Sequence, residues 1–274
     1  MQRKMDSSDE DSDQRREDEE AYSHYNAHVD HILESYQKDD LMSLKEHAVA
    51  LRNQLKPNLG LWMWQPESDQ RELIQVLFEI LTKYSDTDRE IVVESLKIIS
   101  FLASRESREA LLNIESRLEI LFDLLDHSSR IIVKETLEAF AFVALGSWCC
   151  LQSVDFDPNI VVYIERFLTV EGNPLSIRRA TARLLEKLCI GTARSDLVVP
   201  LTNIAARHIR RYVNEDGKVL CALVRAFAKI SSKEDKIKNV LETGVTLDIC
   251  NMLLDECDDD VLQPAFETLT NVMR

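Results

Sequence analysis

Apolar residues recur every three or four positions along most of the chain, which is the spacing of one face of an α-helix. After a polar start, a first helix is predicted from Ala21 by a stripe of five apolar residues: Tyr22, Tyr25, Val29, Ile32 and Tyr36. A second amphipathic helix is predicted over Leu41 to Lys56, and Pro57 ends it. The following connector, 57–67, holds Trp62 and Trp64, which we expect to cap the open end of a core or to anchor a partner.

The rest of the chain repeats one helical pattern. Five predicted helices have similar ends, and their last residues are Ala103, Ala144, Cys189, Ser231 and Met273. These residues are separated by 41, 45, 42 and 42 positions. A period of about 42 residues built from helices alone is typical of armadillo and HEAT solenoids, in which each repeat buries its apolar face against its neighbours.

Within each period the pattern predicts a shorter helix, an acidic or polar turn and a longer helix. The shorter helices are expected at 73–81, 118–125, 161–168, 201–209 and 247–254. Longer final helices favour the armadillo form, so we predict an all-α, right-handed armadillo (ARM) repeat solenoid of about five repeats. In this architecture the exposed face of each third helix lines a concave groove, where function is expected.

The same patterns divide the chain into three predicted parts. Residues 1–20 form a disordered acidic tail, because they carry nine acids and four bases with almost no apolar side chains. Ser7 and Ser8 each precede an acid by three positions and could be phosphorylated, although a solvated tail explains them equally. Residues 21–66 form N-terminal helices and a connector, as a starting half-repeat, and residues 67–274 form the armadillo repeats.

Composition narrows the function classes. A net charge of −15 over 274 residues disfavours nucleic acid and anionic membranes as partners, and no apolar run is long enough to span a bilayer. The six cysteines have no metal-ligand spacing, and we interpret them as reduced core residues. The acidic stretch Asp255 to Asp260 is interpreted as a turn between helices, because it lacks the spacing of a calcium loop.

Chemistry-bearing motifs are scarce. The chain has no phosphate-binding glycine loop, nucleophile elbow or zinc-protease motif, so we predict neither an enzyme nor a cofactor or metal. His24, His28 and His31 lie on one helix face and could share a metal, but exposed histidines on a helix are common. A basic cluster could contact phosphate or complement a helix dipole: Arg207, His208, Arg210 and Arg211.

The C-terminal repeats resemble a known family. Leu188-Cys189, the segment 235–245 and the segment 263–272 fall at the helix and turn landmarks of importin-alpha, and weaker matching extends back to about Leu41. The resemblance implies an armadillo adaptor that carries nuclear-localisation signals. The chain stops at Arg274, so the family's later repeats have no counterpart in this sequence.

Importin-alpha reads its cargo with a Trp and, four residues later, an Asn on each third helix. The resemblance places the Trp positions at Lys97, Glu138, Arg183, Arg225 and Glu267. It places the Asn positions at Phe101, Phe142, Lys187, Lys229 and Asn271, of which only Asn271 keeps the family residue. The family's acidic partner for the signal's key lysine falls at Gly146.

These replacements predict a different ligand. Arg183, Lys187, Arg225 and Lys229, aided by Arg178 and Arg179, give the groove a basic centre that should reject a basic signal and favour carboxylates or phosphates. The alternative is a relaxed surface whose charges are only solvated. The family also folds a basic N-terminal segment into its own groove, whereas here the acidic segment 6–20 could occupy the basic groove in cis.

We therefore predict a non-catalytic adaptor that binds a protein or an acidic peptide in its concave groove. The alternative is a nuclear-import receptor with altered cargo preference. The resemblance also implies a partner related to transport factors and a location in nucleus and cytoplasm. An apolar last repeat over Phe266 to Met273 makes self-association a further expectation.

Overall fold

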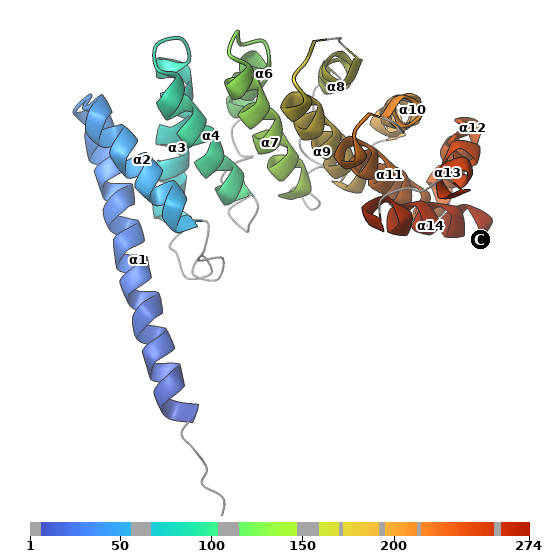
Figure 1. The fold of residues 1–274 in the computed structure, drawn as a ribbon. Coiled ribbons are helices and arrows are strands. Elements are labelled where there is room, and N and C mark those ends of the chain that lie inside the picture. The colour runs from blue at the N-terminus through green and yellow to red at the C-terminus, as the bar shows by residue number, and fades with distance from the viewer. Residues whose placement is uncertain are drawn as a thin grey trace, which may run out of the picture. The chain divides into compact units, whose positions relative to one another are not determined.

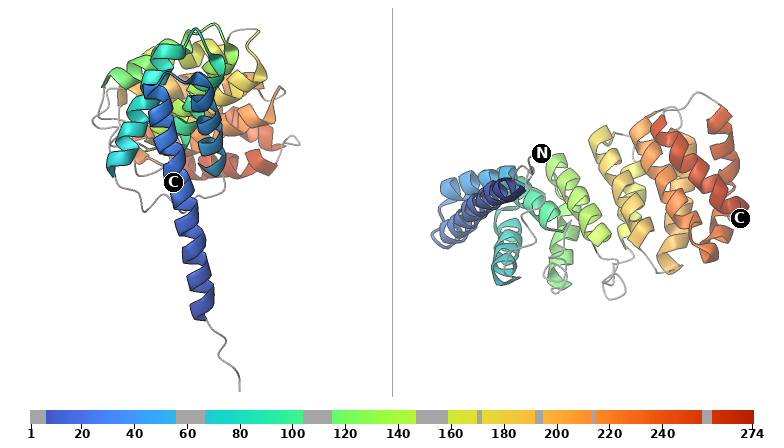
Figure 2. Two further views of the ribbon diagram at one scale, coloured as in Figure 1. Left: turned by 90° about the vertical axis from the view of Figure 1, so that its left-hand side faces the viewer. Right: turned by 90° about the horizontal axis from the view of Figure 1, so that it is seen from below.

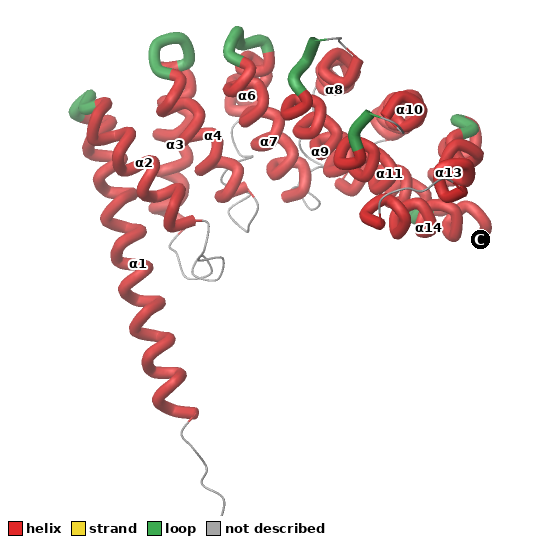
Figure 3. The backbone as a smooth tube through the Cα atoms, in the orientation of Figure 1, coloured by secondary structure: helices red, strands yellow, loops and turns green. Residues whose placement is uncertain are grey.

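The computed structural model describes residues 7–55, 67–103, 115–146, 159–169, 172–191, 195–212, 215–254 and 259–274. Helices, turns and bends account for this part of the chain, and no strand occurs in it (Figure 3). Trp62, Trp64 and most of the acidic turn 255–260 lie outside these ranges. The chain divides into two compact units, Met1–Phe101 and Leu102–Arg274, which we call unit 1 and unit 2.

Unit 1 is a group of helices. It contains α1 (Ser7–Gln37), α2 (Leu41–Leu55), α3 (Glu67–Tyr84) and most of α4 (Arg89–Ala103). Helix α1 packs on α2 and α3 (Figure 1). The predicted apolar stripe of α1 makes this contact, because Tyr25, Val29 and Ile32 are buried.

The N-terminal half of α1 covers most of the segment that the composition predicts as an acidic tail. The helix begins at Ser7 and so includes residues 7–20. Figure 1 shows this half of α1 projecting beyond α2 and α3.

Unit 2 is built from successive helix pairs. The pairs are α6 (Glu115–Leu125) with α7 (Arg130–Gly146), α8 (Asn159–Thr169) with α9 (Leu175–Gly191), α10 (Ser195–Tyr212) with α11 (Gly217–Ser231), and α13 (Val245–Leu254) with α14 (Asp259–Met273). A 3₁₀ turn, Glu234–Lys236, and the short helix α12 (Ile237–Glu242) precede the last pair.

The helices of unit 2 form two layers. Helix α7 packs on α9, α9 on α11, and α11 on α14, while α10 packs on α8 and α13 (Figure 2, right). We call α7, α9, α11 and α14 the inner layer, because unit 2 curves toward them in Figure 1. The first helix of each pair belongs to the outer layer.

The core of unit 2 lies between these layers. Phe140 on α7, Tyr212 on α10 and Phe227 on α11 have no exposed surface. Most of α11 is buried, since α9, α10 and α14 all pack against it. Each helix pair thus buries its apolar face against its neighbours, as the 42-residue period predicts.

One detail of the predicted repeat is wrong. The first helix is longer than the second in the pairs α3–α4 and α10–α11, which have 18 and 15 residues in each case. Apolar periodicity marks only the packed turns, so it missed the polar first turn of α10 and the ends of α3. The division of the chain at Phe101 falls inside α4, and the start of the armadillo repeats at residue 67 stays a prediction.

Described helices contain no segment that is long and apolar enough to cross a membrane. Cys189 and Cys221 are buried as predicted, whereas Cys250 is exposed and is not a core residue. Burial raises the pKa of the Cys189 thiol to about 12, which keeps it protonated and unreactive at neutral pH.

Candidate functional site

The sequence-predicted site residues of unit 2 share one exposed face of the inner layer. We call this set the inner stripe: Glu138 and Phe142 on α7, Arg183 and Lys187 on α9, Arg225 and Lys229 on α11, and Glu267 and Asn271 on α14. All eight side chains are exposed or half-buried. The spacing of four residues puts each pair on the same side of its helix.

Lys97 and Phe101 hold the equivalent positions on α4 of unit 1, and both are half-buried. The Lys97 ammonium lies 2.8 Å from a carboxylate oxygen of Glu94, whose other oxygen accepts a 2.6 Å hydrogen bond from Arg52 Nε. The positive charge of Lys97 is therefore paired with Glu94, an acid of the same helix.

The inner stripe is less basic than the sequence predicts. Arg183 pairs with Glu138 at 3.0 Å, and this contact joins α9 to α7. Lys229 pairs with Glu267 at 3.5 Å, and this contact joins α11 to α14. Lys187 lies 3.3 Å from Glu186 of its own helix, a residue outside the matched register. Acids of the same or a neighbouring helix thus compensate three of the four predicted basic residues.

Arg225 is the exception on the stripe. It is exposed at the middle of α11, and it makes no ion pair with any other described residue. The helix on one side of it, α9, carries Arg183 and Lys187. An exposed guanidinium can bind a carboxylate or phosphate of a ligand by donating charge-assisted hydrogen bonds to it.

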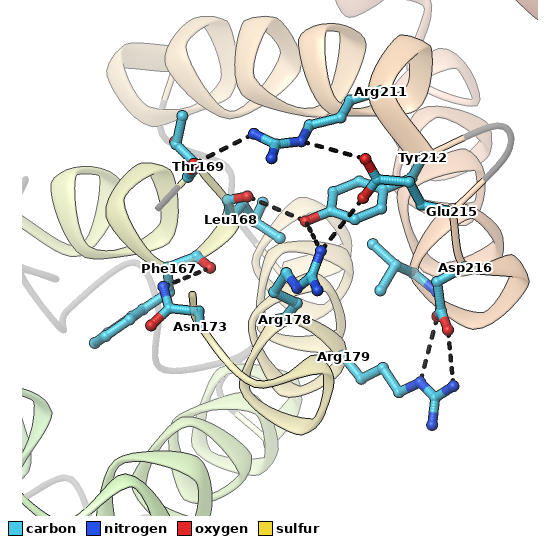
Figure 4. A network of polar contacts seen from close by, with 11 residues as sticks. Phe167, Leu168, Thr169, Asn173, Arg178, Arg179, Arg211, Tyr212, Glu215 and Asp216 are labelled. Carbon is cyan, nitrogen blue, oxygen red and sulfur yellow. Dashed lines mark hydrogen bonds and ion pairs between the residues drawn. The ribbon is translucent and has the colours of Figure 1, made fainter. Parts of the chain in front are cut away.

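Arg178 and Arg179 do not contribute to this basic centre, which corrects the sequence prediction. The Arg179 guanidinium binds both oxygens of Asp216, at 3.3 and 2.7 Å (Figure 4). Asp216 also caps the first turn of α11 by accepting from Val219 N–H at 2.9 Å. The Arg179 contact lowers the pKa of Asp216, so this carboxylate is charged at neutral pH.

Arg178 belongs to a network around the buried Tyr212 hydroxyl. The hydroxyl donates to the Leu168 carbonyl oxygen at 3.1 Å and accepts from Arg178 Nη1 at 3.4 Å (Figure 4). Arg178 also pairs with Glu215 at 3.3 Å. These contacts tie the C-terminal end of α8 to α9 and α10, so both arginines have a structural role.

The basic cluster at the end of α10 likewise joins helices. Arg211 Nη1 donates to the Thr169 carbonyl oxygen at 3.2 Å, and Arg210 Nη2 donates to the Thr243 carbonyl oxygen at 2.9 Å. Thr169 is the last residue of α8 and Thr243 directly follows α12, and the unpaired carbonyls at helix C-termini attract cations. The sequence predicts a hydrated cluster at the end of its own helix, whereas Arg210 and Arg211 bind carbonyl groups at the ends of neighbouring helices.

Replacing Tyr212 with phenylalanine should lower the free energy of unfolding by about 1 to 3 kcal/mol, because the buried Leu168 carbonyl loses its donor while the ring packing remains. Urea denaturation measures the change. Tyr163→Phe is the matched control, since the Tyr163 hydroxyl binds the exposed Asp126 and its loss should cost under about 1 kcal/mol. Equal losses in both variants would contradict this role of Tyr212.

Asn271 is the same residue type as in the resembled family, but its side-chain amide already makes hydrogen bonds within unit 2. Its Nδ2 donates to the Ala228 carbonyl oxygen and to Ser231 Oγ, both at 3.3 Å. These contacts hold α14 against the C-terminal end of α11. The amide therefore serves packing within unit 2. Gly146, the other matched position, is the last residue of α7.

Groups suited to catalysis or metal binding do not converge among the described residues. No three or more described His, Cys, Asp or Glu side chains are arranged to hold a metal ion. The buried His208 has no hydrogen-bond partner within the described chain, and burial lowers its pKa. His24, His28 and His31 lie on α1, and His28 instead meets His47 of α2.

Comparison with known proteins shows the fold. No protein-family model matches the chain, and no curated protein matches it. A designed armadillo repeat protein aligns with 88% of this chain and 98% of its own, at 16% identity and a TM-score of 0.67. Computationally designed armadillo repeat proteins for modular peptide recognition align with 88% of this chain at 15% identity and a TM-score of 0.65.

A third solved structure is a designed armadillo repeat protein in complex with the peptide (KR)4, at 16% identity and a TM-score of 0.67, with 88% of this chain and 98% of that chain covered. At these identities the likeness concerns the fold alone. The protein is an all-α armadillo solenoid, as the 42-residue helical period predicts. Such solenoids are binding scaffolds that present an extended surface to their ligands.

Proposed function

We propose that this protein is a non-catalytic adaptor that binds an extended acidic peptide, or an acidic segment of a protein, along the inner stripe of unit 2. Arg225 carries the proposal, because it is exposed and makes no ion pair with any other described residue. The ion pairs Arg183–Glu138 and Lys229–Glu267 flank it. A ligand carboxylate can bind Arg225 without breaking either pair.

Apolar side chains of the inner layer support a peptide ligand. Ile131 and Phe142 on α7 and Phe266 on α14 are exposed, at 47%, 37% and 58% of their surface. Large exposed apolar groups on a charged face are typical of binding surfaces. A peptide that binds Arg225 through an acidic residue, and that has an apolar residue on each side of this acid, would match these exposed side chains.

The inner stripe differs from what a basic peptide requires. The designed armadillo protein with (KR)4 shows that this fold can hold an alternating basic peptide. Here the unpaired charge of the stripe is a cation, and the acids Glu138, Glu186 and Glu267 are already paired. Like charges would meet at Arg225, so we expect the protein to reject such a peptide.

The direct experiment is a fluorescence-anisotropy titration of the full chain with labelled (DE)4 and (KR)4 peptides. We expect (DE)4 to bind at least tenfold more tightly, with an affinity that falls as salt concentration rises. Tighter binding of (KR)4 would refute the proposal. Arg225→Glu should weaken (DE)4 binding about tenfold or more, because a charge-assisted contact becomes a repulsive one.

Lys238→Glu is the matched control for Arg225→Glu. Lys238 lies on α12, is 84% exposed and pairs only with Glu242, at 3.7 Å, among the described residues. Both variants make the net charge more negative by the same amount, so a general charge effect would weaken binding equally. We expect Lys238→Glu to change (DE)4 affinity less than threefold.

The finer proposals rest on the sequence resemblance. The alternative function is a nuclear-import receptor with altered cargo preference. Such a receptor would be found in nucleus and cytoplasm and would be linked to transport factors, and capture of a basic signal peptide would support it.

Self-association through the last repeat is a second expectation, since Phe266 and Met273 are 58% and 79% exposed. Sedimentation of wild type and Phe266→Ser tests it.

A further inference from the structure

Four of the chain's six histidines lie on the first two helices, and three of them make a close cluster. His28 and His31 come from α1, and His47 comes from α2. The His28 and His47 Nδ1 atoms are 3.1 Å apart. The His31 ring stacks on the His47 ring, with centroids 4.4 Å apart and an angle of 18° between planes.

The short Nδ1–Nδ1 contact limits the protonation state of the pair. One nitrogen must donate a hydrogen and the other must accept it, so at least one imidazole is neutral. If both rings were protonated, two N–H groups and two positive charges would face each other at this distance. The Nδ1–Nδ1 hydrogen bond therefore cannot form when both rings are protonated.

The surroundings of His28 oppose its protonation. Burial lowers the pKa of His28, and the nearby His47, His31 and His24 lower it further. On α1, Glu34 lies 3.9 Å from His31 Nδ1, and it is already bonded to Lys38. On α2, Lys45 is occupied by Asp88 and Glu90.

Helix α3 also packs on α1, but its charges act elsewhere. Glu79 and Lys83 of α3 interact with Tyr36, about two turns along α1 from His28. No acid of α2 or α3 thus contributes to the pKa of His28. A second proton on the pair would remain uncompensated.

We propose that His28 and His47, with His31 stacked on His47, form a proton-sensitive clasp that holds α1 on α2 at neutral pH and weakens in mild acid. The sign follows from the direction of the shift. A histidine whose folded-state pKa lies below its unfolded value supports folding fully above about pH 6.5, and this support is lost as pH falls toward the lowered value.

Opening of the clasp would act on a defined surface. The same faces of α1 and α2 bury Tyr25, Val29 and Ile32 against a set of apolar residues of α2: Leu44, Ala48 and Leu51. Acid would raise the fraction of molecules in which α1 is detached from α2 and this apolar surface is open. The long α1 helix and its acidic first half would move with it.

Hydrogen exchange of the full chain at pH 7.5 and 5.5, corrected for intrinsic exchange rates, tests the clasp. We expect the protection of amides in residues 25–50 to fall by up to about tenfold at pH 5.5, relative to the amides of α9 and α11. The double variant His28→Asn/His47→Asn should lose this pH dependence, because an amide pair can keep the contact without titrating.

His24→Asn is the matched control, since His24 is an exposed imidazole on the same helix and makes no direct hydrogen bond to the pair. It should keep most of the wild-type pH dependence, because His24 contributes least of the three neighbouring histidines to the lowered pKa of His28. Unchanged protection in the wild type, or the same loss in the double variant, would overturn the proposal.

NMR titration of the histidine ring protons gives a second, independent measurement on the wild-type protein. We expect His28 to titrate clearly below the ordinary value near 6.5. Titration of His28 at the ordinary value would also overturn the clasp, whatever the stability of the asparagine variant.

Discussion

Replacing Phe227 with alanine should lower the free energy of unfolding of unit 2 by about 3 to 5 kcal/mol. Phe227 has no exposed surface and lies on α11, which packs against α9, α10 and α14. Truncation leaves a cavity between both layers that well-packed neighbours cannot fill. Urea denaturation followed by circular dichroism measures the loss.

Phe266→Ala provides the control for Phe227→Ala. The same side chain is removed, but Phe266 on α14 is 58% exposed. We expect the free energy of unfolding to change by less than about 0.5 kcal/mol. A large loss for Phe266→Ala, or a small one for Phe227→Ala, would contradict the assignment of core and surface in unit 2.

The second large effect concerns unit 1. Glu94→Ala should lower the free energy of unfolding by about 2 to 4 kcal/mol, because it leaves Arg52 without its acidic partner. The Arg52 and Glu94 side chains are 17% and 9% exposed, and Lys97 shares the same carboxylate. Removing the Glu94 carboxylate therefore leaves the largely buried Arg52 guanidinium without an acidic partner, and it also removes the partner of Lys97.

Glu90→Ala is the matched control on the same helix. Glu90 is 67% exposed and lies 3.4 Å from Lys45, which keeps a closer partner in Asp88 at 2.6 Å. The expected change in unfolding free energy is below about 0.5 kcal/mol. Similar losses in both variants would show that the Arg52–Glu94 contact does not stabilise unit 1.

Most of the fold could be predicted from apolar spacing and a constant period. The stripe at Tyr25, Val29 and Ile32 marked the packed face of α1, and the 42-residue repeat gave the helix pairs of unit 2. The N-terminal start of α1 at Ser7 could not be predicted this way, because residues 7–20 have no apolar stripe.

The exposure of the inner stripe could also be predicted, but its charge balance could not. Register alone placed Arg183, Arg225 and Glu267 on an exposed face. The pairing of Arg183 with Glu138 depends on how α7 and α9 pack, and Glu138 lies 45 residues earlier in the chain. Arg179 was misassigned for a similar reason, because its partner Asp216 lies in the turn before α11.

The central claim is that an acidic peptide binds to the inner layer of unit 2. Photo-crosslinking tests it most directly, with benzoylphenylalanine placed at Phe142 on α7 in one variant and at Val162 on α8 in another. Both positions are exposed, at 37% and 63%, on the inner and outer layers. We predict that labelled (DE)4 crosslinks at position 142 and not at position 162, and that unlabelled peptide competes. Crosslinking at position 162 alone would contradict the claim.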